Sequence, residues 1–144
     1  MSTDVVVGLV VEVHIHPGGD FIRLAMVDIG SSMVQIVFGG PDLVCAGDFV
    51  PVAPPGTRLP GRKKMRRAKF RGQISHGMLG SAAEFGWQPD GPDEVALLNP
   101  SGLHPGSRLD GARWPDLQAE MRPGHLELRE RWAARLRTPN KVRG

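Results

Sequence analysis

The side chains best placed for chemistry lie mid-chain, in the segment GRKKMRRAKFRG at residues 61–72, which has seven basic residues and no acidic one. Guanidinium and ammonium groups bind phosphate oxygens, and arginine can do so through paired donors. The segment belongs to a longer window, residues 49–83, that contains no Asp or Glu. The basic residues of this window are Arg58, Arg62, Lys63, Lys64, Arg66, Arg67, Lys69 and Arg71.

Charge is distributed very unevenly over the 144 residues, whose net charge is +3. The acid-free window holds a charge of +8, whereas the remainder has 10 basic and 15 acidic residues. A single strongly basic region on a mildly acidic protein favours a polyanionic partner, with nucleic acid the first candidate. The alternative is a solvated basic loop without a partner.

Two other chemistries are weaker. His14, His16 and Asp20 could approach one metal ion, but a zinc site needs three or four converging ligands, and no further His or Cys cluster accompanies them. Ser75 and His76 are adjacent in sequence, and adjacent strand residues point to opposite faces, so they form a poor nucleophile and base pair. We therefore expect no enzyme activity, no metal and no cofactor.

The segments around these residues indicate an all-β domain. Apolar residues at period two predict a long half-buried strand, formed by Val5, Val7, Leu9, Val11, Val13 and Ile15. Further short strands are predicted at 21–30, 31–40, 49–56 and 93–100, with Pro51 placing the fourth at an edge or a barrel rim. Short strands separated by Gly and Pro turns favour a small closed β-barrel.

After Gly111 the pattern becomes helical, in the segments WPDLQAEM and HLELRERWAARLR. Leu128, Trp132 and Leu136 recur every four residues, and arginines occupy much of the remaining surface. Such a helix could pack on its own barrel, pair with a second subunit or clamp RNA. We divide the chain into a domain at 1–111 and a basic helical extension at 112–144.

The basic segment itself is predicted to be a strand with a β-bulge near Arg66–Arg67, because Met65 lies on one parity and Ala68 and Phe70 lie on the other. The bulge would turn these three side chains inward. The outward row would then contain Lys64, Arg66, Arg67, Lys69 and Arg71. The competing interpretation is an edge strand protected from aggregation by positive charge.

These motifs resemble a known family. LPGRKKMRRAKFRGQISHGMLGS at 59–81, the strand and His-Pro turn VVVGLVVEVHIHPGGD, and the segments QIVFGGPD and EFGWQPDGPDEVALLNP are similar, in order, to the tRNA-binding domain of bacterial phenylalanyl-tRNA synthetase β chains and to free-standing tRNA-binding proteins. The most specific piece is the Ser-x-Gly-Met motif at Ser75, Gly77 and Met78. The sequence departs from the family at Gly18, Gly19, Phe21, Ile22, Phe38 and Asp42.

The resemblance implies an OB-fold, a five-stranded Greek-key barrel, that binds tRNA by shape and phosphate contacts without catalysis. We expect RNA contacts from Arg58, Lys63, Lys64, Arg66, Arg67, Lys69, Arg71, Ser75, His76 and Met78. Expected partners are tRNA, a synthetase or another tRNA-using enzyme, and a second copy of the chain in a homodimer. The alternative function is a protein-interaction adapter that docks a synthetase.

A single cysteine, Cys45, and the lack of a signal peptide or a long apolar run lead us to expect a cytoplasmic protein without a membrane span.

Overall fold

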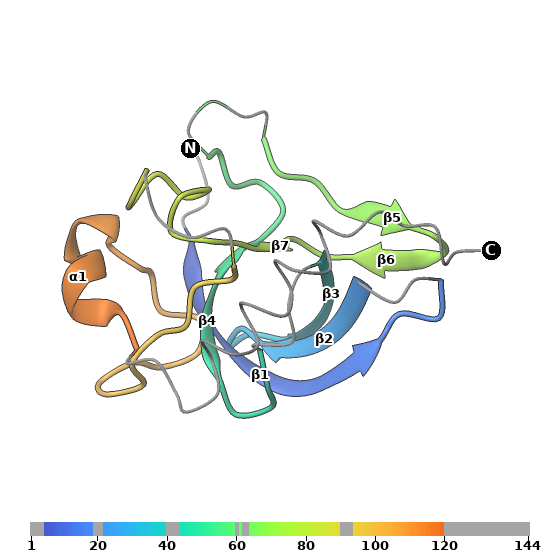
Figure 1. The fold of residues 1–144 in the computed structure, drawn as a ribbon, viewed down its shortest axis with the longest axis horizontal. Helices are drawn as coiled ribbons and strands as arrows, with labels where there is room; N and C mark the ends of the chain where they lie inside the picture. Colours follow the sequence, from blue (N-terminus) through green and yellow to red (C-terminus); the bar gives the residue numbers. More distant parts are fainter. Residues whose placement is uncertain are drawn as a thin grey trace, which may run out of the picture.

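The fold is built almost entirely from strands, as the sequence predicts (Figure 1). A computed structural model describes residues 5–18, 22–39, 44–59, 61, 64–89 and 94–119. The strands are β1 (Val6–Ile15), β2 (Ile22–Asp28), β3 (Met33–Gly39), β4 (Phe49–Ala53), β5 (Ala68–Phe70), β6 (Gln73–Ser75) and β7 (Met78–Leu79). A 3-10 turn η1 (Gly111–Arg113) leads into the short helix α1 (Trp114–Leu117).

The main sheet has the strand order β3-β2-β1-β4-β7, and all its pairs are antiparallel. The all-β class is therefore confirmed. Alternating apolar residues explain the long ladder of β2 with β3, where Ile36 and Phe38 are buried on one face. Strands β5 and β6 form a separate hairpin.

Strand β1 has a bulge at Val11, where its register with β2 shifts between Val10 and Glu12. The prediction of one continuous buried face was wrong, because Val11 and Ile15 are 40% and 63% exposed. The extra residue changes which face each later side chain points to. Val10 lies in the core cluster inside the curved sheet, whereas Val7 lies in a second cluster.

Strand β4 lies between β1 and β7, so an edge position, one of the two alternatives predicted for it, was wrong. Pro51 is opposite Val7, whose own N–H and C=O bond to Ser107 and Gly106 and therefore point away from β4. Val7 and Pro51 thus form a non-hydrogen-bonded antiparallel pair, in which the nitrogen of Pro51 also points away from β1. Because proline has no N–H, no backbone donor is left unpaired at this position. The pairing of β4 with β7 begins only at Val52.

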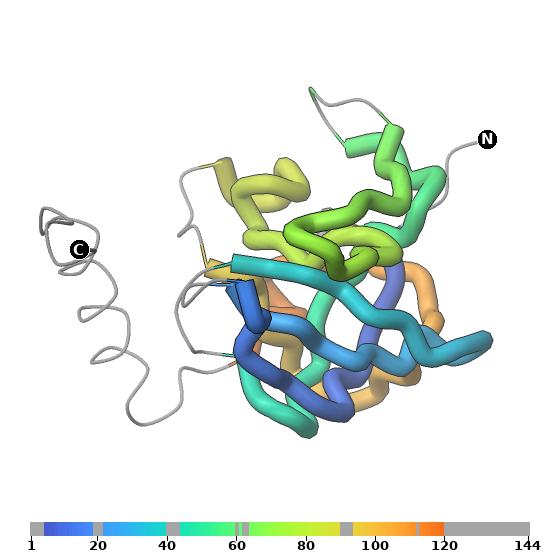
Figure 2. The backbone as a smooth tube through the Cα atoms, turned by 90° about the vertical axis from the view of Figure 1, so that its right-hand side faces the viewer, coloured from blue at the N-terminus to red at the C-terminus, as the bar shows by residue number. Residues whose placement is uncertain are grey.

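Residues 73–79 connect β3, at one edge of the main sheet, to β4, and they end in β7, which is the other edge. The His76 N–H donates to the carbonyl oxygen of Gln35 on β3 at 2.8 Å, and Leu79 then pairs with Val52 on β4. Figure 2 shows this segment, in green, running beside β3, in cyan. The curved sheet thereby encloses an apolar interior, and its strands form an open five-stranded ladder bridged by residues 73–79.

The chain after β7 covers the outer face of the first strand. Ser81 and Glu84 cap a turn reciprocally, with N···O distances of 2.9 and 3.0 Å. Residues 94–100 form isolated bridges at Leu98 in place of the strand predicted there. Trp114 and Leu117 are buried in the second cluster, so the packed chain continues past Gly111. Among the described residues, no helix has the length and apolarity to cross a bilayer.

Candidate nucleic-acid interface

The β5–β6 hairpin is formed by the second half of the basic segment. Ala68 pairs with Ser75, Lys69 with Ile74 and Phe70 with Gln73, leaving Arg71 and Gly72 as the two turn residues. Both have positive φ, 48° and 87°, which is the conformation of a type I′ turn. This turn matches the twist of the two strands, so a non-glycine residue is held in the left-handed region at the hairpin tip.

The predicted phosphate-binding residues lie along this hairpin and the loop before it. Arg58 and Lys64 form an isolated bridge, joined by the bond from the Met65 N–H to the Thr57 carbonyl oxygen at 2.7 Å. Arg66 and Arg67 connect this bridge to β5. The exposed cations are Arg58, Lys64, Arg66, Arg67, Lys69 and Arg71. Lys63 lies outside the described residues.

These cations are not neutralised within the part of the chain that the structure describes. No described carboxylate forms an ion pair with Arg66, Arg67 or Lys69. Since no described carboxylate neutralises them, the cations remain available to an external anion.

The prediction that Met65, Ala68 and Phe70 point inward together was wrong for two of the three. Ala68 is exposed and Phe70 is 47% exposed, whereas Met65 is half-buried and packs against the cluster of Ala53, Leu59 and Phe85. The segment is also not one bulged strand, because among its described residues only Lys64 and then Ala68–Phe70 are paired. Side-chain direction in β5 is fixed by its register with β6, not by the apolar pattern.

The Ser-x-Gly-Met motif serves the fold. The Ser75 hydroxyl is buried, accepts the Val37 N–H at 2.9 Å and donates to the Gly77 carbonyl oxygen at 2.9 Å. Gly77 has φ 117°, and a Cβ there would lie 2.5 Å from the Ala53 carbonyl oxygen. Met78 pairs with Ala53 and packs on the same cluster as Met65.

The structure therefore does not bring Ser75 and Met78 to the surface with the basic residues. His76 is half-buried and hydrogen-bonded to β3 through its backbone, and its Nδ1 atom has no hydrogen-bond partner among the described residues. The Ser75 hydroxyl is already bonded on both sides, which also leaves no hydrogen bond for a catalytic base.

Sequence reasoning missed a contact between the first turn and the hairpin. His16 is buried and its Nε2 atom lies 2.9 Å from the Phe70 carbonyl oxygen, while an Arg71 guanidinium nitrogen donates to the Gly18 carbonyl oxygen. The only signal in the sequence was the His-Pro turn itself, which does not reveal a partner 54 residues away.

A metal site on His14, His16 and Asp20 gains no support from the described residues. His14 is exposed and bonds to Glu12, His16 is engaged with the hairpin, and Asp20 lies outside the described residues. The described part of the chain contains no group of three or more His, Cys, Asp or Glu side chains suited to a metal ion.

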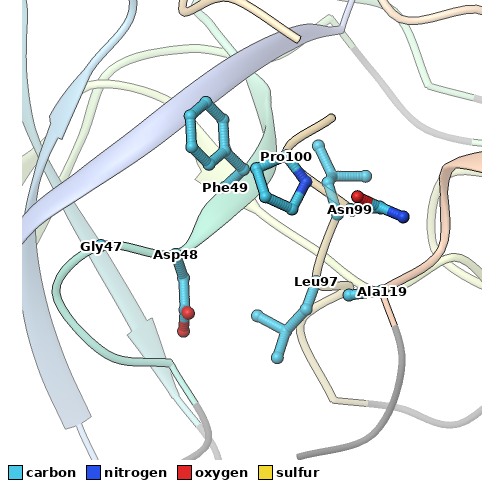
Figure 3. Close-up of a pocket in the computed structure, with 8 residues that line it drawn as sticks. Gly47, Asp48, Phe49, Leu97, Asn99, Pro100 and Ala119 are labelled. Atoms are coloured by element: carbon cyan, nitrogen blue, oxygen red, sulfur yellow. The ribbon is translucent and has the colours of Figure 1, made fainter. Parts of the chain in front are cut away.

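A pocket lies between the turn before β4 and residues 97–100, close to Ala119 (Figure 3). Asp48 and Leu97 face each other across it, and Phe49 and Pro100 form part of its wall. Its described lining has no basic side chain, so the pocket does not extend the basic surface of the hairpin.

Comparison with known proteins agrees with this arrangement. Residues 5–108 match the family model described as "Putative tRNA binding domain". The phenylalanine–tRNA ligase beta subunit of Shouchella clausii is 50% identical over 86 residues, which is 59% of this chain and 10% of that protein. The corresponding subunit of Oleidesulfovibrio alaskensis is 42% identical over 106 residues, 74% of this chain and 13% of that protein. The chain thus spans about a tenth of the length of these relatives.

Two solved structures have a similar fold. The MetRS related protein from Pyrococcus horikoshii superposes with a TM-score of 0.53 at 21% identity, covering 74% of this chain and 88% of that one. The C-terminal domain of Plasmodium vivax p43 superposes with a TM-score of 0.52 at 23% identity, covering 85% and 71%. At these identities the likeness concerns the fold alone. The match to the family model covers most of the described chain, and the protein belongs to the tRNA-binding domain family.

Proposed function

We propose that this chain binds tRNA through the cations of the β5–β6 hairpin and the loop before it, without catalysing a reaction of its own. The observation that supports this most directly is a set of exposed cations without described carboxylate partners, in a member of the tRNA-binding domain family. Because a paired hairpin holds Lys69 and Arg71 in place, less conformational entropy is lost on binding than with a flexible tail.

The recognition is by shape and phosphate contacts. Double-stranded RNA is read mainly through its backbone and groove shape, and tRNA presents such helices in a fixed arrangement. Phe70 is the only aromatic residue of the basic segment, and its exposed ring leaves it able to stack on an unpaired base. Phosphate contacts therefore supply most of the affinity in this proposal.

The relatives are named as synthetase subunits, so we propose that the bound tRNA is presented to a synthetase or to another tRNA-using enzyme. We keep the homodimer as part of this proposal, because two hairpins would offer one tRNA two basic surfaces. A protein adapter that docks a synthetase without RNA is the alternative, and the same experiment distinguishes it.

The test is a charge reversal of Arg66, Arg67 and Lys69 to Glu, with tRNA binding followed by titration. These side chains are exposed, so the fold should survive while binding is lost. The matched control reverses Arg129, Arg131 and Arg135 to Glu, which changes the net charge by the same amount within the C-terminal extension. Normal binding by the hairpin variant together with loss in the control would assign RNA binding to the extension and defeat the proposal.

A further inference from the structure

We propose that His16 is a positioning residue, which as a neutral imidazole fixes the basic β5–β6 hairpin against the first turn of the chain. The proposal rests on the tRNA-binding function proposed above and deepens it, because His16 acts on the hairpin and not on the RNA. His16 is only 1% exposed, directly follows β1 and is one of four buried polar or charged residues among those described.

The hydrogen bonds of His16 define its tautomer. The Gly18 N–H donates to Nδ1 at 2.7 Å, so Nδ1 has a free lone pair and no proton. The proton of the neutral ring is therefore on Nε2, which donates to the Phe70 carbonyl oxygen at 2.9 Å. One ring thus joins the turn after β1 to the last residue of β5.

The hairpin tip makes a second contact with the same turn. A guanidinium nitrogen of Arg71 donates to the Gly18 carbonyl oxygen. The backbone approaches closely here, because a Cβ at Gly18 would lie 2.9 Å from His16 Cε1 and 3.2 Å from the Arg71 Cβ. His16, Gly18 and Arg71 therefore form one compact junction.

The hairpin needs this junction. Only three residue pairs join β5 to β6, and a short two-stranded hairpin is marginally stable in water. Strand β6 is anchored to β3 by Gln35 Nε2, which donates to the Ile74 carbonyl oxygen at 2.9 Å. Within the described residues, the bond from His16 to Phe70 is what joins the β5 backbone to a segment other than β6.

The basic residues Arg66, Arg67 and Lys69 lie in or next to β5. Fixing β5 before the RNA arrives lowers the conformational entropy lost on binding, which raises affinity without any added contact. His16 thus contributes to binding although its side chain is buried.

The junction works only with a neutral ring. Protonation of Nδ1 would replace the acceptor by a donor facing the Gly18 N–H, and it would place a second positive charge beside Arg71. The described charged group at this junction is Arg71; Asp20, further along the turn, lies outside the described residues, and His14 is turned outward to Glu12. The junction therefore needs Nδ1 as an acceptor and Nε2 as a donor.

The test uses two variants that each keep one half of the junction. In His16→Gln the side-chain amide can still donate to the Phe70 carbonyl oxygen, whereas in His16→Asn the side-chain oxygen can still accept the Gly18 N–H but no longer reaches β5. Hydrogen exchange of the amides of residues 66–75, relative to those of β2, reports how firmly the hairpin is held. Titration of tRNA reports affinity, and His14→Asn is the control on the same strand.

We expect His16→Asn to speed exchange in the hairpin and weaken tRNA binding by roughly three- to tenfold, the factor contributed by one hydrogen bond. His16→Gln and His14→Asn should stay within about twofold of the wild type.

Equal hairpin exchange in His16→Asn and the wild type would overturn the proposal. An equal loss of hairpin protection in His16→Asn and His16→Gln would also overturn it, because the imidazole would then contribute only through packing. If neither variant folds, hairpin exchange in the wild type decides, and hairpin amides that exchange as fast as those of an unprotected chain would also overturn the proposal. The exchange measurement contains no RNA. A wild type that fails to bind tRNA would therefore defeat the proposed function and leave this inference to the exchange result.

Discussion

At the scale of single residues, Met65 and Phe70 lie close in sequence but in different surroundings. Met65 packs against Leu59 and Phe85, and its N–H and C=O bond to Thr57 and Gly56. Phe70 is 47% exposed near the hairpin tip, and its carbonyl oxygen lies 2.9 Å from His16 Nε2. A charge introduced at these two positions should have very different effects.

We predict that Met65→Asp lowers the free energy of unfolding by about 2 kcal/mol or more, because a partly buried carboxylate loses hydration without a partner. Phe70→Asp should stay within about 0.5 kcal/mol of the wild type, as surface substitutions usually do. Denaturant unfolding of both variants measures the difference. Equal destabilisation would show that the Phe70 ring is part of the core after all.

The exposure of the cations could be predicted from residue type alone, because Arg and Lys are almost never fully buried without a partner. The exposure of Phe70 could not. Its apolar side chain suggested a core position, but the register with β6 places it opposite Gln73 in a hairpin that projects from the sheet. Nothing in the local pattern indicates that β5 is exposed among the described residues.

At the scale of the elements, the hairpin and its preceding loop should behave as a phosphate-binding surface. If about five of the exposed cations contact phosphates, the slope of log K against log salt concentration for tRNA should be roughly −3 to −5. Changing Arg66 and Arg67 to Gln should reduce the magnitude of that slope by about 1.5. Binding titrations at several salt concentrations measure both values.

Exchange of both residues for Lys is the matched control, since it keeps the charge and should keep the slope. An affinity that does not change between low and physiological salt would contradict the phosphate surface. So would a slope that is the same in the Gln variant and in the wild type.

Strand positions were predictable where apolar alternation is long, as in β2 and β3, and less so where geometry depends on distant partners. The bulge at Val11 has no residue type that marks it, and it appears because β1 must pair with β2 while also facing two clusters. The internal place of β4 was hidden by Pro51, since the sequence does not show which way the missing N–H points.

At the scale of the whole molecule, the division of the chain into 1–111 and 112–144 stays a prediction, although described residues beyond Gly111 are packed into the domain. The Trp114 Nε1 atom donates to Gln88 Oε1 at 3.0 Å. The Trp114 ring packs against the Trp87 ring in a tilted arrangement, with the ring centroids 5.5 Å apart. The Asn99 N–H donates to the Leu117 carbonyl oxygen at 2.8 Å. Residues 114–119 are therefore part of the packed domain. The amphipathic pattern of Leu128, Trp132 and Leu136 lies outside the described residues.

Two truncations should separate these parts. A chain ending at Gly111 loses Trp114 and Leu117 from the second cluster, and removing one buried Trp side chain alone costs about 3–5 kcal/mol. That cost approaches the whole stability of a small domain, so we predict that this chain is unfolded or nearly so. A chain ending at Ala119 keeps both residues and should melt within a few degrees of the full chain.

The chain ending at Ala119 also tests the proposed dimer. It retains the hairpin and lacks only residues 120–144 of the extension. If the stripe of Leu128, Trp132 and Leu136 forms the dimer contact, light scattering should give a dimer for the full chain and a monomer for the truncated one. The measurement is made at tens of micromolar, a concentration where a dimer of moderate affinity is populated.

With one hairpin per molecule instead of two, the truncated chain should bind tRNA more weakly but still with a salt-dependent affinity. A full chain that is monomeric would remove the dimer from the proposal, whereas complete loss of binding on truncation would assign the RNA contact to the extension.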